Sequence, residues 1–190
     1  MIFYLHGFNS SGQSAKGRYL AEQFADISFH RPSYPPDPDE AITYLANYLE
    51  QRIQVKQSTM IIGSSLGGYY AQYLSRQFQS CVVMINPALN PAVTLTPYIG
   101  LQQNYYTNEE YYFGEAELTR LLQYDVANPC LTPVPTLLLL DEADEIIDYR
   151  HAYELYRGCA ERHCFPDGDH QFQHLAESVP LIRRFYQQHG

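Results

Sequence analysis

The chain has 190 residues, of which 45% are hydrophobic, and this size and composition are typical of one globular domain with a continuous core. Its 21 acidic residues outnumber its 12 basic ones, and an acidic chain of net charge −9 repels phosphate backbones, so we expect no nucleic-acid partner. The first apolar run is too short for the core of a signal peptide, and no apolar run approaches the length of a membrane span, so we expect no membrane partner. No two cysteines form a CxxC pair, and we expect a cytoplasmic protein.

Apolar runs and helical periodicities alternate along the first half of the chain. Short apolar runs predict strands that are covered on both faces, and a 3.6-residue periodicity predicts the helices between them. In chain order we expect a strand at 2–5, a helix at 14–24, a strand at 27–30, a helix at 39–54, a strand at 59–62, a helix to about Gln77 and a strand at 81–85. Helices of this length between strands imply right-handed crossovers and a parallel sheet.

An insertion interrupts this alternation at about residues 88–128, where prolines, glycines and tyrosines are dense and a helix is expected at 115–123. Its tyrosines either pack on the body of the protein or line a pocket as a lid, and both interpretations stay open. The alternation then returns with a strand at 134–140, a helix at 149–159, a strand at 162–165 and a last helix ending near Gln188. Pro180 is expected in the first turn of that helix, or between it and a preceding short turn. Residues 1–190 therefore form one predicted α/β domain, with a mostly parallel sheet flanked by helices.

Residues 63–67 read G-S-S-L-G, the pattern of a nucleophile elbow with Ser65 at its centre. An apolar run precedes the pattern and a helical periodicity follows it, as the strand–turn–helix geometry of an elbow requires. Small residues on either side of the serine let neighbouring chain pack against so tight a turn. A five-residue pattern also arises by chance in glycine turns, but this context favours Ser65 as a nucleophile.

A serine nucleophile needs a base, and the base needs a carboxylate that holds its tautomer. In open parallel sheets, functional groups gather at the carboxyl ends of strands. His170 follows the last predicted strand in a glycine-containing loop, so we predict that it is the base. Asp144 lies in an acidic run after the strand at 134–140, and the following pair Ile146-Ile147 would anchor its loop in the core, so we predict that it is the acid. Asp148 is the reserve candidate, and the rest of the run is expected to be solvated.

Acyl transfer also needs two convergent donors for the oxyanion. One predicted donor is the backbone N–H of Leu66, which directly follows the nucleophile. The other is the N–H of Phe8, in the loop after the first strand, where Gly7 allows a close approach. His6 is expected to fix that loop or to form a wall of the pocket, rather than to carry a proton.

Five stretches together resemble the YqiA-like esterases, a small branch of the α/β-hydrolase superfamily. They read L-H-G-F-N-S-S at 5–11, G-S-S-L-G-G-Y-Y-A at 63–71, N-P-A at 86–88, D-E-I-I-D-Y-R at 144–150 and G-D-H at 168–170. The resemblance spans nearly the whole chain. It implies a single-domain α/β-hydrolase fold and a soluble bacterial serine esterase whose triad is Ser65, Asp144 and His170. Ala143 stands where a glycine is expected before the acid, so the local turn is expected to differ.

The patterns together predict hydrolysis of a small-molecule carboxylic ester or thioester through an acyl-enzyme on Ser65. Acyl transfer at the same site and a catalytically silent binding protein with the same pocket are the alternatives. Neither a cofactor nor a metal is expected, because no familiar zinc spacing matches the four candidate ligands Cys159, His163, Cys164 and His170. The oligomeric state is left open.

Overall fold

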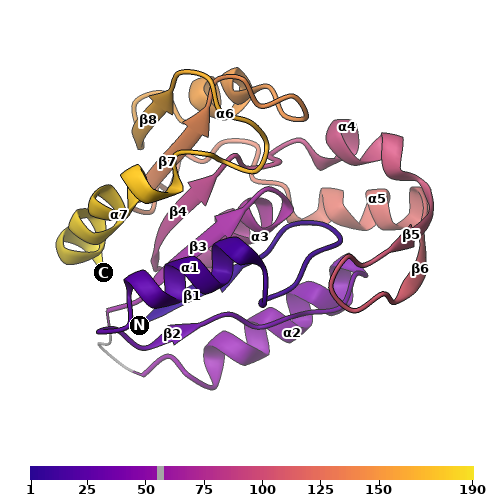
Figure 1. Cartoon of the computed structure of the whole chain (residues 1–190), viewed down its shortest axis with the longest axis horizontal. Helices are drawn as coiled ribbons and strands as arrows, with labels where there is room; N and C mark the ends of the chain where they lie inside the picture. Colours follow the sequence, from indigo (N-terminus) through magenta and orange to yellow (C-terminus); the bar gives the residue numbers. More distant parts are fainter. Residues whose placement is uncertain (55–57) are drawn as a thin grey trace.

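The computed structural model describes residues 1–54 and 58–190, and its centre is a sheet with helices on both faces (Figure 1). Within these ranges every neighbouring strand pair of this sheet is parallel. Its six strands, in the spatial order β2-β1-β3-β4-β7-β8, are β1 (Ile2–Leu5), β2 (Phe29–His30), β3 (Met60–Ser64), β4 (Cys81–Ile85), β7 (Thr136–Asp141) and β8 (Glu161–Phe165). The predicted parallel sheet flanked by helices is confirmed.

Apolar side chains of the strands divide between two cores, because successive side chains of a strand point to opposite faces. Ile2 and Tyr4 of β1 belong to one core, and Phe3 and Leu5 belong to the other. The helices that cover the first core are α1 (Ala15–Gln23) and α7 (Leu175–His189), and those that cover the second are α2 (Pro38–Glu50), α3 (Leu66–Gln77) and α6 (Tyr149–Leu155) (Figure 1). The sheet is thus buried on both sides, as its uninterrupted apolar strands predicted.

Side-chain caps begin several of these helices, α1 and α2 among them. Asp37 accepts hydrogen bonds from the N–H groups of Asp39 and Glu40 at 3.0 and 3.1 Å, which satisfies free donors in the first turn of α2. Ser14 accepts from the N–H of Gly17 at 3.2 Å and so caps α1. α2 ends at Glu50, four residues before the predicted boundary at 54, while the predicted α1 and α3 agree closely with the structure.

The insertion lies at the end of the molecule opposite the two termini (Figure 1). Its elements are α4 (Pro91–Leu95), a 3₁₀ turn (Thr96–Tyr98), β5 (Gly100–Gln103), β6 (Glu110–Phe113), α5 (Glu115–Leu121) and a second 3₁₀ turn (Leu122–Tyr124). β5 and β6 pair antiparallel, with Leu101 opposite Tyr112. The sequence predicted the helix but not this hairpin.

Pro180 lies inside α7, at its sixth residue, and the prediction that it lies in the first turn is wrong. The helix begins at Leu175 because Leu175 and Val179 pack on the same core as Ile182, and together they extend the apolar face back before the proline. Proline lacks an N–H, so one helical hydrogen bond is missing there. Among the described helices, none is both long and apolar enough to cross a membrane.

Candidate active site

Ser65 lies at the turn between β3 and α3, in backbone that non-glycine residues seldom adopt (φ 55°, ψ −122°). Such conformations cost about 1–3 kcal/mol and persist only where the surroundings enforce them. The N–H of Ser65 donates to the carbonyl of Ile85 at 3.0 Å, and its carbonyl accepts from the N–H of Ala88 at 3.0 Å. The end of β4 therefore holds this strained turn in place.

The two glycines of the G-x-S-x-G pattern are required by close approaches of the backbone. A Cβ on Gly67 would lie 2.2 Å from the carbonyl oxygen of Leu5 and 2.4 Å from that of His6. A Cβ on Gly63 would lie 2.2 Å from the carbonyl oxygen of Gly67. No side chain fits at either position, so the spacing follows from the geometry of the elbow.

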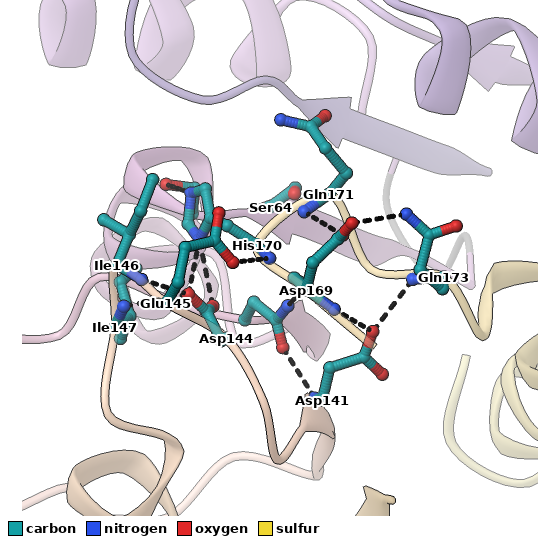
Figure 2. A network of polar contacts seen from close by, with 12 residues as sticks. Ser64, Asp141, Asp144, Glu145, Ile146, Ile147, Asp169, His170, Gln171 and Gln173 are labelled. Carbon is teal, nitrogen blue, oxygen red and sulfur yellow. Dashed lines mark hydrogen bonds and ion pairs between the residues drawn. The ribbon is translucent and has the colours of Figure 1, made fainter. Parts of the chain in front are cut away.

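The three predicted triad residues come together in the structure. His170 Nε2 lies 3.0 Å from Ser65 Oγ, and His170 Nδ1 lies 2.9 Å from Asp144 Oδ2 and 3.1 Å from Asp144 Oδ1. These residues come from the β3–α3 turn, the loop after β7 and the loop after β8. The side chain of Asp144 is 2% exposed, so water does not compete for its bond to the imidazole (Figure 2).

The loop around Asp144 fixes the direction of its carboxylate. Asp144 Oδ1 accepts from the N–H groups of Ile146 and Ile147, both at 2.9 Å. Ile147 is buried as the sequence predicted, but the prediction is wrong for Ile146, which is 42% exposed and lines the cavity instead. Asp148, the reserve candidate, instead caps α6 through the N–H of Arg150 at 3.0 Å. Its pKa is lowered by the Arg150 side chain, and it lies on the surface rather than against the imidazole.

The expectation that the rest of the acidic run is solvated is wrong for Asp141. The strand β7 continues one residue further than predicted, and Asp141 is therefore fully buried at its end. Asp141 Oδ1 lies 2.7 Å from His174 Nδ1, while Oδ2 accepts from the N–H groups of Gln173 at 2.8 Å and Asp169 at 3.3 Å. These contacts bind β7 to the loop that carries His170 (Figure 2).

Two more residues of the loop after β7 contact the loop of the histidine. The carboxylate of Glu145 accepts from the N–H of His170 at 3.0 Å, and the N–H of Ala143 donates to the carbonyl of Asp167 at 3.1 Å. Ala143 does not have a positive φ. The turn therefore tolerates alanine where a glycine was expected.

The loop after β1 passes directly beside Ser65. A Cβ on Gly7 would lie 3.2 Å from Ser65 Cβ and 3.7 Å from its Oγ. Phe8 follows in this loop, and Leu66 is the first residue of α3, where backbone N–H groups lack partners within the helix. Both predicted oxyanion donors thus belong to segments adjoining Ser65.

His6 is a fixed neutral residue of the same loop. Its ring stacks on Tyr34 at a centroid distance of 3.9 Å, and its Nδ1 donates to the carbonyl of Gly7 at 2.9 Å. Burial lowers the pKa of His6 to about 4, so the imidazole is uncharged at neutral pH. These contacts agree with the predicted role in fixing the loop.

A cavity of about 470 Å³ opens above Ser65 and His170. One wall is mostly polar and comes from β1, the loop after it, the start of α1 and the end of β3; it contains Tyr4, Ser10, Ser14, Lys16 and Ser64. A second group of lining residues is more apolar and comes from the insertion and the loop after β7; it contains Leu95, Tyr98, Tyr105, Tyr106, Ile146 and Ile147. The site can therefore hold a small molecule with one polar and one apolar portion.

The tyrosines of the insertion divide between the two interpretations that the sequence left open. Tyr105 and Tyr106 line the cavity, whereas Tyr111 packs edge-on against Phe8. The hairpin is also bonded to the loop after β1, since the N–H of Tyr105 donates to the carbonyl of Asn9 at 3.0 Å and the hydroxyl of Tyr111 donates to Asn9 Oδ1 at 2.5 Å. The insertion thus both packs on the body and contributes to the wall of the pocket.

Cys130 and Cys159 form a disulfide, which the sequence did not predict and which is rare in the reducing compartment that we expected. Cys81 is buried as expected, and burial raises the pKa of its thiol to about 12. Within residues 1–54 and 58–190, no group of three or more His, Cys, Asp or Glu side chains is arranged to hold a metal ion.

Residues 1–187 match the family described as "Uncharacterised protein family (UPF0227)". The chain belongs to this family. A UPF0227 protein from Shewanella sediminis is 27% identical over 198 residues, which cover 98% of this chain and 99% of the relative. The assignment confirms the resemblance to the YqiA-like branch that the motifs indicated.

Solved structures similar to this UPF0227 protein establish its fold. Alpha/beta hydrolase domain-containing protein 10 from mouse superposes with a TM-score of 0.75 at 14% identity, over 98% of this chain and 89% of the mouse chain. An esterase from Pyrococcus furiosus gives a TM-score of 0.72 at 16% identity, over 99% of this chain and 81% of that chain. The α/β-hydrolase fold predicted from the sequence is confirmed.

Proposed function

We propose that this UPF0227 protein is a serine hydrolase that cleaves a carboxylic ester or thioester through an acyl-enzyme on Ser65. The observation that carries the proposal is the continuous contact from Ser65 Oγ to His170 Nε2 at 3.0 Å, and from His170 Nδ1 to Asp144 Oδ2 at 2.9 Å. A serine hydroxyl becomes a strong nucleophile when a base within hydrogen-bond reach accepts its proton. The similarity to an esterase from P. furiosus supports the same class of reaction.

In the proposed mechanism, Ser65 Oγ attacks the carbonyl carbon while its proton moves to His170 Nε2. Asp144 stabilises the resulting imidazolium through Nδ1, and the backbone N–H groups of Leu66 and Phe8 bind the oxyanion. When the tetrahedral intermediate collapses, His170 gives the proton to the leaving alcohol or thiol, and the acyl group stays on Ser65. Water, deprotonated by His170, then attacks the acyl-enzyme. As the second tetrahedral intermediate collapses, the acid leaves and His170 returns the proton to Ser65 Oγ.

The strained backbone of Ser65 favours this role over a silent binding pocket. A binding pocket has no need of a serine at φ 55°, nor of a buried carboxylate directed at the imidazole that contacts it. Strain of this kind is retained where the surroundings enforce it, and active sites are a common case.

Steady-state hydrolysis of p-nitrophenyl esters and acyl thioesters of graded chain length tests the proposal. Ser65→Ala is expected to lower kcat by about 10⁶, because the members of a triad act as a unit. His170→Gln is expected to be similarly inactive, whereas His151→Gln, a matched change on the exposed surface of α6, is expected to keep the parent activity. Binding of esters without turnover would indicate a silent binding protein, and product formed only with an added alcohol or amine would indicate acyl transfer.

A further inference from the structure

Lys16 places an ammonium group in the wall of the catalytic cavity. It is the second residue of α1, and its Nζ donates a hydrogen bond to Ser64 Oγ at 2.7 Å. Ser64 immediately precedes Ser65, so the ammonium lies close to the reacting centre. The proposed hydrolysis makes no use of this charge.

No carboxylate among the described residues forms an ion pair with Lys16. The nearest acids of the site are committed elsewhere, since Asp144 binds His170 and Asp141 binds His174. A lysine ammonium has three donor hydrogens, and the bond to Ser64 uses one of them. The Nζ also lies 6.0 Å from the centroid of the Phe172 ring, a contact that uses no hydrogen-bond acceptor. The remaining donors are available to a molecule in the cavity.

The charge on Lys16 is present at neutral pH. Burial lowers its pKa to about 8, and three carboxylates act in the opposite direction, namely Asp141, Asp144 and Asp169. The other titratable side chains of the cavity are His170 and the tyrosines Tyr4, Tyr98, Tyr105 and Tyr106. A partly buried cation that has no anionic partner is stabilised by a ligand that brings an anionic group to it.

We propose that Lys16 binds a free carboxylate of the substrate, so that the preferred substrates are esters or thioesters that also carry a carboxylate. This inference rests on the proposed hydrolase function and adds the substrate class to it. The carboxylate belongs to either the acyl or the leaving portion of the molecule, because Lys16 and Ser65 line the same cavity of about 470 Å³. Apolar residues that line the same cavity, Leu95 and Ile147 among them, accommodate the hydrocarbon of the same molecule.

A singly charged carboxylate suits this site better than a phosphate. One ammonium supplies one positive charge, whereas Asp141, Asp144 and Asp169 contribute negative potential at the same point. The cost of removing an ion from water rises with the square of its charge, whereas its attraction to a single ammonium rises only in proportion to that charge, so a dianion is the less favourable ligand here. The net charge of −9 further opposes its entry.

Two matched pairs of esters test the inference, with hydrolysis followed by pH-stat titration at pH 7. Monomethyl glutarate and methyl pentanoate differ by a carboxylate on the acyl side. The butanoate ester of γ-hydroxybutyrate and butyl butanoate differ by a carboxylate on the alcohol side. In at least one pair we expect kcat/KM of the acid ester to exceed that of its neutral partner by about ten- to a hundredfold, the range of a charge-assisted hydrogen bond. The preferred pair identifies the portion of the substrate that Lys16 binds.

The variant Lys16→Met is expected to abolish this preference, while Arg18→Met, which removes a charge from the exposed side of the same helix, keeps it. Circular dichroism and thermal melting confirm that each variant is folded. Equal losses on both members of a pair in Lys16→Met would overturn the inference and show a structural role for the lysine. The parent enzyme alone can also overturn the inference. It would do so if its kcat/KM were higher for the neutral esters, or higher for the phosphate monoester analogue of the acid ester. Absence of hydrolysis with all four esters would overturn the proposed function and this inference together, whereas hydrolysis without acid preference overturns the inference alone.

Discussion

Replacing Asp141 by asparagine removes a buried charge that joins β7 to the loop that carries His170. The Asp141 carboxylate is 0% exposed and accepts from His174 Nδ1 at 2.7 Å and from the N–H groups of Gln173 at 2.8 Å and Asp169 at 3.3 Å. Hydrogen bonds to a charged group contribute about 1.5–3 kcal/mol each. Asparagine keeps one accepting oxygen but directs an NH₂ group at other donors, so one or two of these bonds are lost and we expect a loss of about 3 kcal/mol in the free energy of unfolding.

For a chain of 190 residues, this loss corresponds to a fall in Tm of about 6–12 °C. We also expect kcat to fall at least about tenfold, because a small displacement of the loop moves His170 away from the nucleophile. Differential scanning calorimetry and ester hydrolysis measure the two effects. Glu142→Gln is the matched control, since Glu142 is exposed and adjacent in sequence, and its Tm is expected to change by less than about 2 °C. A Tm and a kcat for Asp141→Asn that match those of Glu142→Gln would refute the reasoning.

Three further outcomes follow from the site. Asp144→Asn is expected to lower kcat by about 10⁴, because His170 loses the carboxylate that holds its correct tautomer. Asp148→Asn loses only part of a helix cap, so its kcat is expected to stay within a few-fold of the parent value. The reverse result would assign the role of the acid to Asp148. Replacing Tyr105 and Tyr106 by alanine is expected to shift the chain-length preference in an ester series with little change in Tm, and an unchanged profile would remove both tyrosines from the substrate site. The ratio of kcat/KM for acid esters to kcat/KM for neutral esters is expected to stay level below pH 7. It is expected to fall as the pH rises through about 8, because Lys16 loses its charge there. A ratio that stays constant up to pH 9.5 would contradict this.

The convergence of Ser65, Asp144 and His170 was predictable because the three residues are tied to the topology. Parallel strands deliver their carboxyl ends to one edge of the sheet, so Ser65 after β3, Asp144 after β7 and His170 after β8 converge once the strands are recognised. The pattern of apolar runs was sufficient to locate these strands. The role of Asp141 was missed because the predicted strand stopped at Leu140, and a one-residue extension moves an acid from solvent into the sheet.

Other features depend on contacts between distant segments, which local patterns do not contain. In the loop of the β5–β6 hairpin, the side chain of Asn104 accepts hydrogen bonds from the N–H groups of Tyr106 and Thr107. The hairpin therefore lacks the two-residue turn with glycine by which hairpins are recognised in a sequence. The disulfide joins Cys130 to a cysteine 29 residues away. Lys16 has the sequence context of an ordinary surface residue on a helix, and only the three-dimensional structure places its ammonium against Ser64, in the cavity that Ser65 also lines.

Covalent labelling by a fluorophosphonate tests the central claim most directly, because the reagent requires an activated serine rather than a particular substrate. Mass spectrometry of the peptide containing residues 63–67 distinguishes Ser65 from its neighbour Ser64. We predict a single adduct on Ser65, its absence in Ser65→Ala and a strongly reduced labelling rate in His170→Gln, since the imidazole accepts the hydroxyl proton. An adduct on Ser64 or on another residue, or labelling of Ser65 at an unchanged rate without His170, would contradict the account.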